Sequence, residues 1–257
     1  MHEITFMEIS DLAYDTSKGL FAISNKGDLF SMELKIENNK IHKFELRNAW
    51  HLKNKKGKRF SKKKRDAEGM YFHQGQLLIS FERKPKVTAF TLQGRKIKNL
   101  DIAPALKDIN NYQGKNSALE ALIQHPKFGL ITAPENPLKN MDKEVHTLFS
   151  KDKRWSFPAD ASLTAMENMS DGSLLILEKE FHPLTLGHSV WLKKVNIMKC
   201  KEDLCTVDIL AKLESSDGWR LDNFEGLTRI DEKRYLMISD DNNSFLQECI
   251  LVLFEVD

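Results

Sequence analysis

The sequence predicts an all-β protein that folds as a single β-propeller, with five blades. A short motif that ends in Glu-Gly-Leu or a close variant occurs five times, and each copy is followed by a turn and an apolar strand. The copies start roughly 45 to 60 residues apart, which is a spacing typical of propeller blades. Apolar and polar residues alternate over short runs that turns interrupt, as in strands rather than helices. Because the repeat runs from end to end, we expect one domain over residues 1–257.

In each copy the strand after the motif ends in an acidic or polar residue. The four clear copies pair Glu68-Gly69-Met70 with Glu82, Glu120-Ala121-Leu122 with Glu135, Thr164-Ala165-Met166 with Glu178, and Glu225-Gly226-Leu227 with Asp240 and Asp241. A weaker first copy runs from Ser10-Asp11-Leu12 to Asn25. Every blade therefore contributes the same two positions to the fold.

The repeats also supply the outer strands, bounded by Gly, Asp or Asn turn signals. Strand candidates lie at 69–72, 77–82, 86–92 and 96–102 in the second unit, at 119–124, 130–133, 145–150 and 154–157 in the third, and at 163–169, 173–177, 190–198 and 206–213 in the fourth. In the first unit the long stretch 28–52 leaves a sixth blade open as an alternative. One short helical insertion is expected at 104–109.

The fifth unit has only three strand candidates, at 224–230, 235–239 and 250–256, so it lacks an outer strand. The N-terminal run from Ile4 to Ile9 has no partner in its own unit. We therefore expect this N-terminal strand to pair into the last blade and close the ring, because closure removes exposed sheet edges.

Propeller geometry places a set of acids on one face. The innermost strand of a blade runs along the central axis and the second strand returns antiparallel, so the start of the first and the end of the second lie together. Seven carboxylates should crowd one mouth of the channel: Glu68, Glu120, Glu225, Glu82, Glu135, Glu178 and Asp241. Asp66, Asn136, Asn223, Asp240 and Asn242 should join them.

The overall charge of the chain excludes some classes of partner. The formal net charge is +2, which gives no general attraction for nucleic acid. The sequence contains no run of eighteen apolar residues, so we expect no membrane span. We expect a monomer that binds a small anionic substrate or ligand.

A basic stretch from Lys53 to Arg65 carries nine Lys or Arg residues and no acid. The simpler interpretation is a solvated loop that enters the second blade, because runs of like charge repel and stay hydrated. The alternative is a loop that attracts a polyanion toward the mouth. Phe60 is the only aromatic residue among these cations, which argues against a platform for stacking bases.

Two cysteines bear on the cellular compartment. Cys200 and Cys205 flank a turn between two strand candidates, and a hairpin there would bring them within disulfide range. Such disulfides belong to oxidising compartments, so we expect a periplasmic or secreted protein whose export signal is absent from this sequence. Two reduced thiols and a cytoplasmic location are the open alternative.

Several motifs in the right order resemble the phytase-like family called esterase-like activity of phytase. They are Asp66-Ala67-Glu68-Gly69 with Leu78-Ile79-Ser80-Phe81-Glu82-Arg83, and Asp222-Asn223-Phe224-Glu225-Gly226-Leu227 with Ile238-Ser239-Asp240-Asp241-Asn242-Asn243-Ser244 and Gln247. Residues 116–122 and 177–181 also fit. The resemblance covers nearly the whole chain. It implies a β-propeller, commonly of an exported bacterial protein, with a distant relation to phytases that hold phosphate with calcium.

So many acids at one mouth call for a compensating positive charge, and calcium accepts carboxylate and amide oxygens. The predicted metal ligands are Asn223, Glu225, Asp240, Asp241 and Asn242, with Glu68 or Glu82 as the general base of a phosphoesterase. The predicted substrate-binding residues are Asp66, Arg83, Glu135, Glu178, Lys179 and Arg220. The alternative is a non-catalytic binding propeller, in which these acids accept backbone hydrogen bonds and fix the register between blades.

Overall fold

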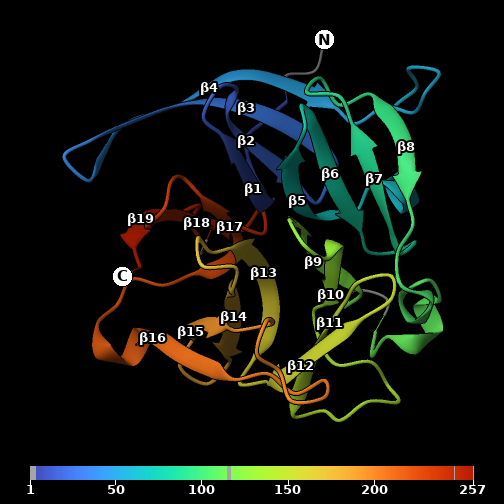
Figure 1. Cartoon of the computed structure of the whole chain (residues 1–257). Coiled ribbons are helices and arrows are strands. Elements are labelled where there is room, and N and C mark those ends of the chain that lie inside the picture. Colours follow the sequence, from blue (N-terminus) through green and yellow to red (C-terminus); the bar gives the residue numbers. More distant parts are fainter. Residues whose placement is uncertain (1–3, 115–116, 246, 257) are drawn as a thin grey trace.

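The computed structural model describes residues 4–114, 117–245 and 247–256. Five antiparallel sheets surround a common axis, which confirms the all-β fold and the five blades (Figure 1). Four sheets have four strands and the last has three. Within the described residues no helix is long and apolar enough to cross a membrane.

Each blade is one continuous stretch of chain. Blade 1 contains β1 (Ile9–Asp15), β2 (Gly19–Ser24), β3 (Asp28–Glu37) and β4 (Lys40–His51); blade 2 contains β5 (Ala67–His73), β6 (Gln76–Phe81), β7 (Lys86–Phe90) and β8 (Lys96–Leu100). Blade 3 contains β9 (Leu119–His125), β10 (Gly129–Pro134), β11 (Val145–Phe149) and β12 (Arg154–Pro158). Blade 4 contains β13 (Ser162–Asn168), β14 (Leu174–His182), β15 (Gly187–Val195) and β16 (Val207–Glu214); blade 5 contains β17 (Asn223–Arg229), β18 (Arg234–Asp240) and β19 (Leu251–Glu255). The stretch 28–52 is thus the outer hairpin of blade 1 rather than a sixth blade.

The short irregular segments lie between these strands. Two 3₁₀ turns, η2 (Pro104–Leu106) and η3 (Ile109–Asn111), occupy the place of the expected helical insertion. The basic stretch contains η1 (Lys62–Lys64) and is anchored at two points. Arg59 pairs with Asp28 at 3.1 Å, and the ring of Phe60 packs against those of Phe81 and Phe90.

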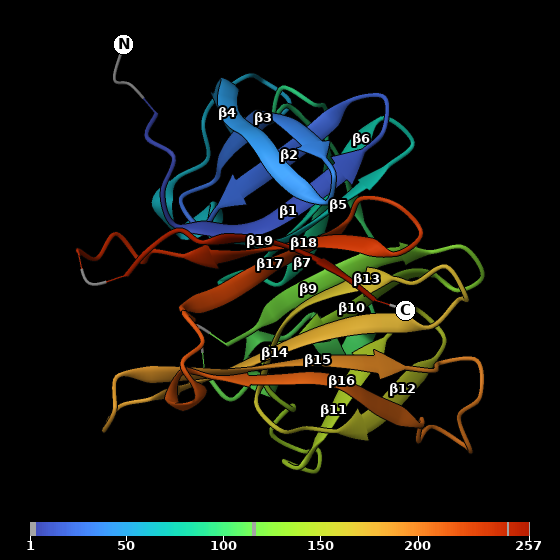
Figure 2. The same ribbon diagram turned by 90° about the vertical axis from the view of Figure 1, so that its left-hand side faces the viewer.

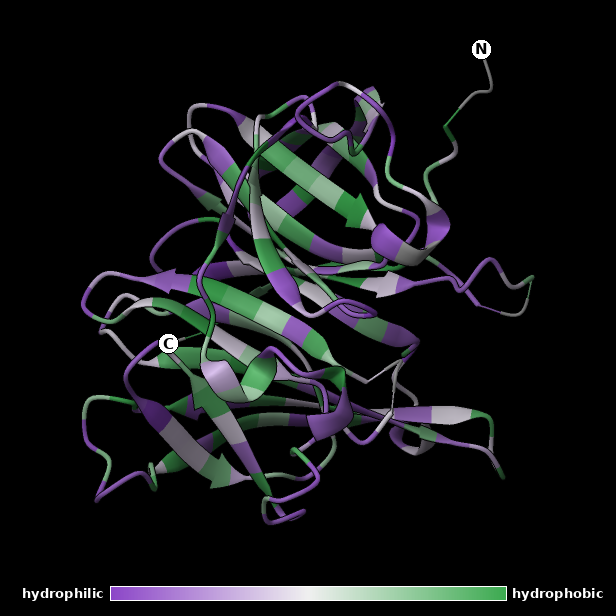
Figure 3. Ribbon diagram, turned by 90° about the vertical axis from the view of Figure 1, so that its right-hand side faces the viewer, coloured by the Kyte–Doolittle hydropathy of each residue, from purple (hydrophilic) through white to green (hydrophobic). Residues whose placement is uncertain are grey.

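The core consists of apolar layers between neighbouring blades. In β6, Leu77, Ile79 and Phe81 pack into the layer shared with blade 1, whereas Leu78 packs into the layer shared with blade 3. Both faces of a blade are therefore buried, and the alternating side chains of one strand serve two different layers. Hydrophobic residues concentrate in the strands and hydrophilic residues in the connecting loops (Figure 3).

The predicted closure of the ring by an N-terminal strand is wrong for the described residues. Residues 4–8 form no strand, and the last sheet holds only β17, β18 and β19. The reason lies at Glu8, whose φ of 52° turns the chain out of the extended conformation before β1. Phe6 instead packs edge-on against Phe30, with ring centroids 5.1 Å apart.

Backbone and side-chain contacts join blades 1 and 5 in place of a shared sheet. The Glu8 N–H donates to Asp241 Oδ1 at 2.9 Å, and the Asn25 N–H donates to the Glu8 carbonyl at 3.1 Å. We call this junction the seam. It closes the ring through hydrogen bonds to a loop rather than through strand pairing.

Asp11 of β1 links three blades near the axis. Its buried carboxylate accepts the N–H groups of Leu12, Met70 and Leu227 at 2.8, 2.6 and 3.0 Å. Burial raises the pKa of Asp11 well above its usual range, although these backbone hydrogen bonds oppose the shift. Met70 belongs to blade 2 and Leu227 to blade 5, so one side chain fixes the relative position of the three innermost strands.

The motif glycines allow these innermost strands to approach closely. A Cβ at Gly226 would lie 2.9 Å from the Asp11 Cα and 2.7 Å from Ile238 Cγ2. A Cβ at Gly69 would collide with the carbonyl oxygen of Glu120 in the next blade. The Glu-Gly pair of the repeat is therefore a packing requirement at the axis as well as a source of acids.

A disulfide joins Cys200 and Cys205 in the loop between β15 and β16. This loop of blade 4 reaches across to the outer edge of blade 3. The Ser156 N–H donates to the Asp203 carbonyl at 2.6 Å, and the Cys205 N–H donates to the Ser156 carbonyl at 2.8 Å. The disulfide loop thus covers part of β12, which is otherwise an exposed edge strand.

Candidate functional site

The functional candidates lie at the mouth of the channel where the first strands start and the second strands end. A small, polar cavity of about 290 Å³ opens there. It is lined by Asn25, Asp66, Glu68, Glu82, Arg83, Glu120, Glu135, Lys179, Glu225, Asp240 and Asn242. We call this cavity the acidic mouth, because seven of its eleven lining residues are acids and only two are cations.

β-Bulges position the innermost acids. In every blade the pairing of the first two strands shifts at the motif, where Ser10, Glu68, Glu120, Thr164 and Glu225 have no direct partner. A bulge breaks the alternation of side chains and redirects the extra residue. Three of the five bulges carry glutamate, which is how blades 2, 3 and 5 each bring a carboxylate to the acidic mouth.

The structure brings together nine of the thirteen residues that the sequence assigned a role. They are Asp66, Glu68, Glu82, Arg83, Glu135, Lys179, Glu225, Asp240 and Asn242. Two further residues of the acidic mouth had no assigned role. Glu120 was placed at the mouth by the repeat, and Asn25 ends the second strand of blade 1, which is the position that Glu82 occupies in blade 2.

Asn223, Glu178, Arg220 and Asp241 do not line the acidic mouth. Asn223 borders it from a neighbouring hollow, where its side-chain amide donates to Glu225 at 2.7 Å. Glu178 is fully buried and accepts hydrogen bonds from Lys193 at 2.7 Å and from the Ala161 N–H at 3.1 Å. These hydrogen bonds give the Glu178 carboxylate a structural role.

Arg220 and Asp241 also have partners of their own. Arg220 pairs with Glu248 on an exposed loop. Asp241 Oδ1 accepts the N–H groups of Glu8 and Asn243, so it belongs to the seam. Asp240 lines the mouth, but its Oδ1 accepts the Asn242 N–H at 2.8 Å. Asp240 and Asp241, two of the predicted metal ligands, thus already accept backbone hydrogen bonds in the seam and in the loop after β18.

Three acids of blade 2 lie close enough together in the acidic mouth to hold a metal ion. One carboxylate oxygen from each of Asp66, Glu68 and Glu82 lies within 4.8 Å of the other two. Two ligands at about 2.4 Å from one ion lie at most about 4.8 Å apart, so this spacing fits calcium. Asp66 also pairs with Arg83, and Glu82 Oε1 accepts the Ala118 N–H at 3.3 Å.

The acids of the mouth perturb one another's ionisation. Burial raises the pKa of Glu68 and of Glu120 well above the usual range, and neighbouring carboxylates raise both further. Burial also raises the pKa of Glu82 to about 7 and that of Asp240 to about 7. The metal-free mouth therefore holds protons near neutral pH that isolated carboxyls would have released.

Lys179 is the cation most closely involved with these acids. Its ammonium donates to Glu225 at 2.6 Å and also to the side chain of Asn223. Burial lowers the pKa of Lys179, but the charges of Glu225, Glu120 and Glu135 outweigh burial and raise it above its normal value. Lys179 and Arg83 are two cations against seven acids, so acidic side chains outnumber basic ones in the cavity.

A second hollow of about 500 Å³ adjoins the acidic mouth and shares Glu135 and Lys179 with it. Phe181 and Ser162 also line this hollow. Phe181 stands at the end of β14, in a hairpin that projects from the same end of the molecule as the loop after β18 (Figure 2). The hollow offers room beside the acids for the remainder of a bound molecule.

The raised pKa values predict an unusual pH dependence of stability. A carboxyl whose pKa is about 7 when folded and near 4.5 when unfolded favours the folded state most at low pH. The metal-free protein should therefore lose stability as the pH rises from about 5 through 7. Each kcal/mol lost lowers the Tm of a domain of this size by about 2–4 °C.

Thermal unfolding of chelator-treated protein at pH 5.5 and 8 would test this expectation. The variant Glu82→Gln cannot ionise and should show a smaller decrease in Tm between the two pH values. Glu45→Gln, at an exposed position in β4, is the matched control and should behave as the unaltered protein does. A Tm that rises from pH 5.5 to 8 in the metal-free protein would contradict the raised pKa values.

Comparison with known proteins adds a family to this geometry. A family model described as Phytase-like, esterase-like activity of phytase, matches residues 4–243. No curated protein matches the chain. Among solved structures, a glutaminyl cyclase from Myxococcus xanthus is similar over 98% of this chain and 92% of its own, at 11% identity and a TM-score of 0.48. A PQQ-bound aldose sugar dehydrogenase from Streptomyces coelicolor is similar over 98% and 95%, at 10% identity and a TM-score of 0.46. Resemblances this weak carry no information about what this chain binds.

Proposed function

The chain belongs to the Phytase-like family, whose model carries the description esterase-like activity of phytase, and from this premise we propose that it is a calcium-assisted phosphoesterase acting at the acidic mouth. One observation carries the proposal: the oxygens of Asp66, Glu68 and Glu82 lie within 4.8 Å of one another in a cavity with surplus negative charge. Two like charges at about 4 Å repel each other by roughly 1–4 kcal/mol. A divalent cation would relieve that repulsion and accept these hard oxygen ligands.

The other residues of the mouth have roles that follow from their charge. Calcium held by Asp66 and Glu68 would bind a phosphate oxygen and polarise the phosphorus. Glu82, whose carboxylate lies beside Asp66 and Glu68, would accept a proton from the attacking water. Lys179 and Arg83, the two cations that line the cavity, would bind the remaining phosphate oxygens. The alcohol part of the ester would occupy the hollow beside Glu135.

A specific observation favours the second candidate function, a non-catalytic ligand- or protein-binding propeller. Several of the repeated acids already have structural partners. Asp11 accepts three backbone N–H groups, Glu178 pairs with Lys193, and Asp241 holds the seam. If the remaining acids behave in the same way, the carboxylate ring is structural and the mouth binds its ligand without turnover.

Calcium titration by calorimetry on chelator-treated protein distinguishes the two functions. We expect binding that Glu68→Gln abolishes, with Glu45→Gln as the control that leaves it unchanged. Saturating calcium at about 100 times its Kd should stabilise the fold by about 2.7 kcal/mol. Loss of binding in Asp241→Ala but not in Glu68→Gln would move the ion to the end of β18. No heat of binding at millimolar calcium would overturn the metal-assisted mechanism.

Hydrolysis is then measured directly with a chromogenic phosphate ester in the presence of calcium. The Glu82→Gln variant should bind calcium but lose the general base, which typically contributes about 10²–10⁴-fold to the rate. Calcium binding without measurable hydrolysis of any phosphate ester would favour the binding propeller. We further propose a monomer that is periplasmic or secreted, which the Cys200–Cys205 disulfide supports.

A further inference from the structure

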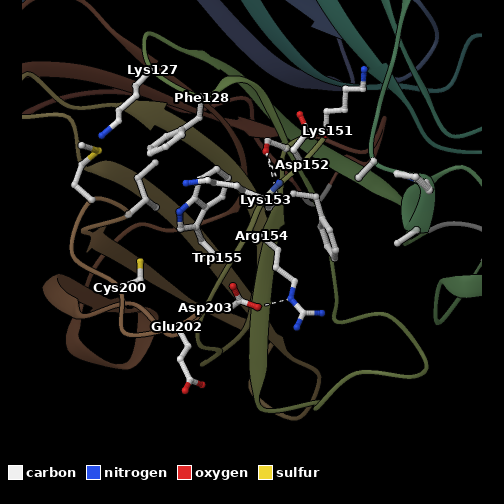
Figure 4. Close-up of a pocket in the computed structure, with 17 residues that line it drawn as sticks. Lys127, Phe128, Lys151, Asp152, Lys153, Arg154, Trp155, Cys200, Glu202 and Asp203 are labelled. Carbon is white, nitrogen blue, oxygen red and sulfur yellow. Dashed lines mark hydrogen bonds and ion pairs between the residues drawn. The ribbon is translucent and has the colours of Figure 1, made fainter.

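A larger cavity, separate from the acidic mouth and from the hollow beside it, lies at the opposite end of the blades. Its volume is about 800 Å³, within the range of small-molecule sites and well above the 290 Å³ of the mouth. Four segments form it: the turn between β9 and β10, the turn between β11 and β12, the disulfide loop of blade 4, and the start of η2 before blade 3 (Figure 4). We call it the interblade cavity.

The β9–β10 turn holds an aromatic ring in a fixed position in this cavity. His125 Nδ1 accepts the backbone N–H groups of Lys127 and Phe128 at 3.1 and 3.3 Å. The Phe128 ring stacks on the His125 ring at 5.0 Å and contacts the buried ring of Trp155 at 4.8 Å. Phe128 itself is only half-buried, so its ring offers a preformed aromatic surface.

Two ammonium groups lie close to that ring. Lys127 Nζ and Lys153 Nζ are 5.3 and 5.4 Å from the centroid of Phe128, and Figure 4 shows them approaching it from different sides. In the described parts of the chain neither lysine forms an ion pair. Attraction to a ring face contributes roughly 0.5–1 kcal/mol at an exposed site, so it compensates only part of the charge of each lysine.

The acids that line the cavity do not neutralise these two lysines. Asp203 pairs with Arg154 at 2.5 Å, and the carboxylate of Glu202 points away from the rings in Figure 4. Asp152 is exposed in the same turn as Lys153. The site thus combines an aromatic surface with two ammonium groups that lack a carboxylate partner.

The wall opposite the rings is also preformed. The disulfide fixes the loop that carries Asp203, and the two backbone hydrogen bonds to Ser156 attach this loop to β12. A ligand would therefore enter a cavity whose walls are already ordered, which reduces the entropic cost of binding.

We propose that the interblade cavity binds a flat aromatic molecule that carries a carboxylate. The ring of the ligand packs against Phe128 and Trp155, with Met198 at the edge of the cavity. Its carboxylate pairs with the ammonium group of Lys127 or of Lys153, both of which lie beside the Phe128 ring and have no carboxylate partner in the described residues. This inference is independent of the function proposed for the acidic mouth.

The test uses 2-naphthoate as the probe, titrated into chelator-treated full-length protein by calorimetry. The neutral analogue 2-naphthylmethanol should bind about tenfold more weakly or worse, because it cannot form charge-assisted hydrogen bonds. Acetate, which lacks the ring, should give no measurable binding. The double variant Lys127→Ser/Lys153→Ser should lose about tenfold in affinity for 2-naphthoate.

Two controls make the outcome specific. The double variant Lys18→Ser/Lys84→Ser changes two exposed lysines outside the cavity and should bind as the unaltered protein does. Glu68→Gln, which alters the acidic mouth, should leave 2-naphthoate binding unchanged and so separates the two proposals. Equal affinity for 2-naphthoate and 2-naphthylmethanol, unchanged affinity in Lys127→Ser/Lys153→Ser, or no binding at about 10 mM 2-naphthoate, where a site with a Kd of about 1 mM would be nearly saturated, would each overturn the proposal.

Discussion

Replacing Asp11 with alanine is expected to lower the free energy of unfolding by about 3–5 kcal/mol. The substitution leaves the N–H groups of Leu12, Met70 and Leu227 without their acceptor at a buried position. Each unsatisfied buried group costs about 1–3 kcal/mol. The effect is large because the three groups belong to three blades, so the packing of the innermost strands suffers along with the hydrogen bonds.

Urea denaturation followed by tryptophan fluorescence measures this loss. Asp11→Asn retains one side-chain oxygen and should lose less stability than Asp11→Ala. Asp208→Ala, at an exposed position of β16, is the control and should change stability by less than about 0.5 kcal/mol. A loss below about 1 kcal/mol in Asp11→Ala would show that the three backbone groups find other partners.

The second large effect is expected at Lys193, whose ammonium is fully buried. It lies 2.7 Å from Glu178 and 2.6 Å from Asp160, and it donates to the Pro158 carbonyl at 3.1 Å. Burial raises the pKa of Glu178, and Lys193 opposes that shift. Lys193→Met should destabilise the protein by about 3–5 kcal/mol, because it leaves a buried carboxylate without its counter-charge.

A double substitution tests this explanation. In Lys193→Met/Glu178→Gln no unpaired charge is buried, and the glutamine oxygen can still accept the N–H groups of Asp160 and Ala161. The double variant should therefore be more stable than Lys193→Met alone. Lys194→Met, which removes a partly exposed ion pair with Asp171, is the matched control and should cost less than about 1 kcal/mol. If Lys193→Met and Lys194→Met lose the same stability, Lys193 does not hold the Glu178 carboxylate. Glu178 would then again be a candidate substrate-binding residue.

The number of blades and the position of the mouth could be predicted because they depend on local patterns. Alternation and turn residues specify each strand, and the antiparallel order of the first two strands in each blade places Glu68 and Glu82 at the same end. The bulges that redirect Glu68, Glu120 and Glu225 could not be predicted in the same way. A bulge depends on the register between two strands, which the sequence of one strand does not specify.

Contacts with other strands and loops account for the errors at Glu178 and Asp241. Glu178 occupies the repeat position of a mouth residue, but Lys193 from the adjacent strand occupies its carboxylate. The same is true of Asp241, which belongs to the oxygen-rich run Asp240-Asp241-Asn242-Asn243 yet accepts the backbone N–H of Glu8. The predicted closing strand failed for a local reason, the turn at Glu8, which a run of apolar residues does not reveal.

The seam has a consequence for how the ring is assembled. Because no sheet is shared between the two ends of the chain, each blade can form from consecutive residues as it leaves the ribosome. Blades 1 to 4 can pack in succession while blade 5 is still being made. Only the arrival of β17 and β18 allows Leu227 to reach Asp11 and Asp241 to reach Glu8, so ring closure comes last. When the folded molecule is pulled by its ends, the same junction should part first, since blades 1 and 5 are neighbours that only non-covalent contacts join, whereas the chain itself connects the other neighbouring blades.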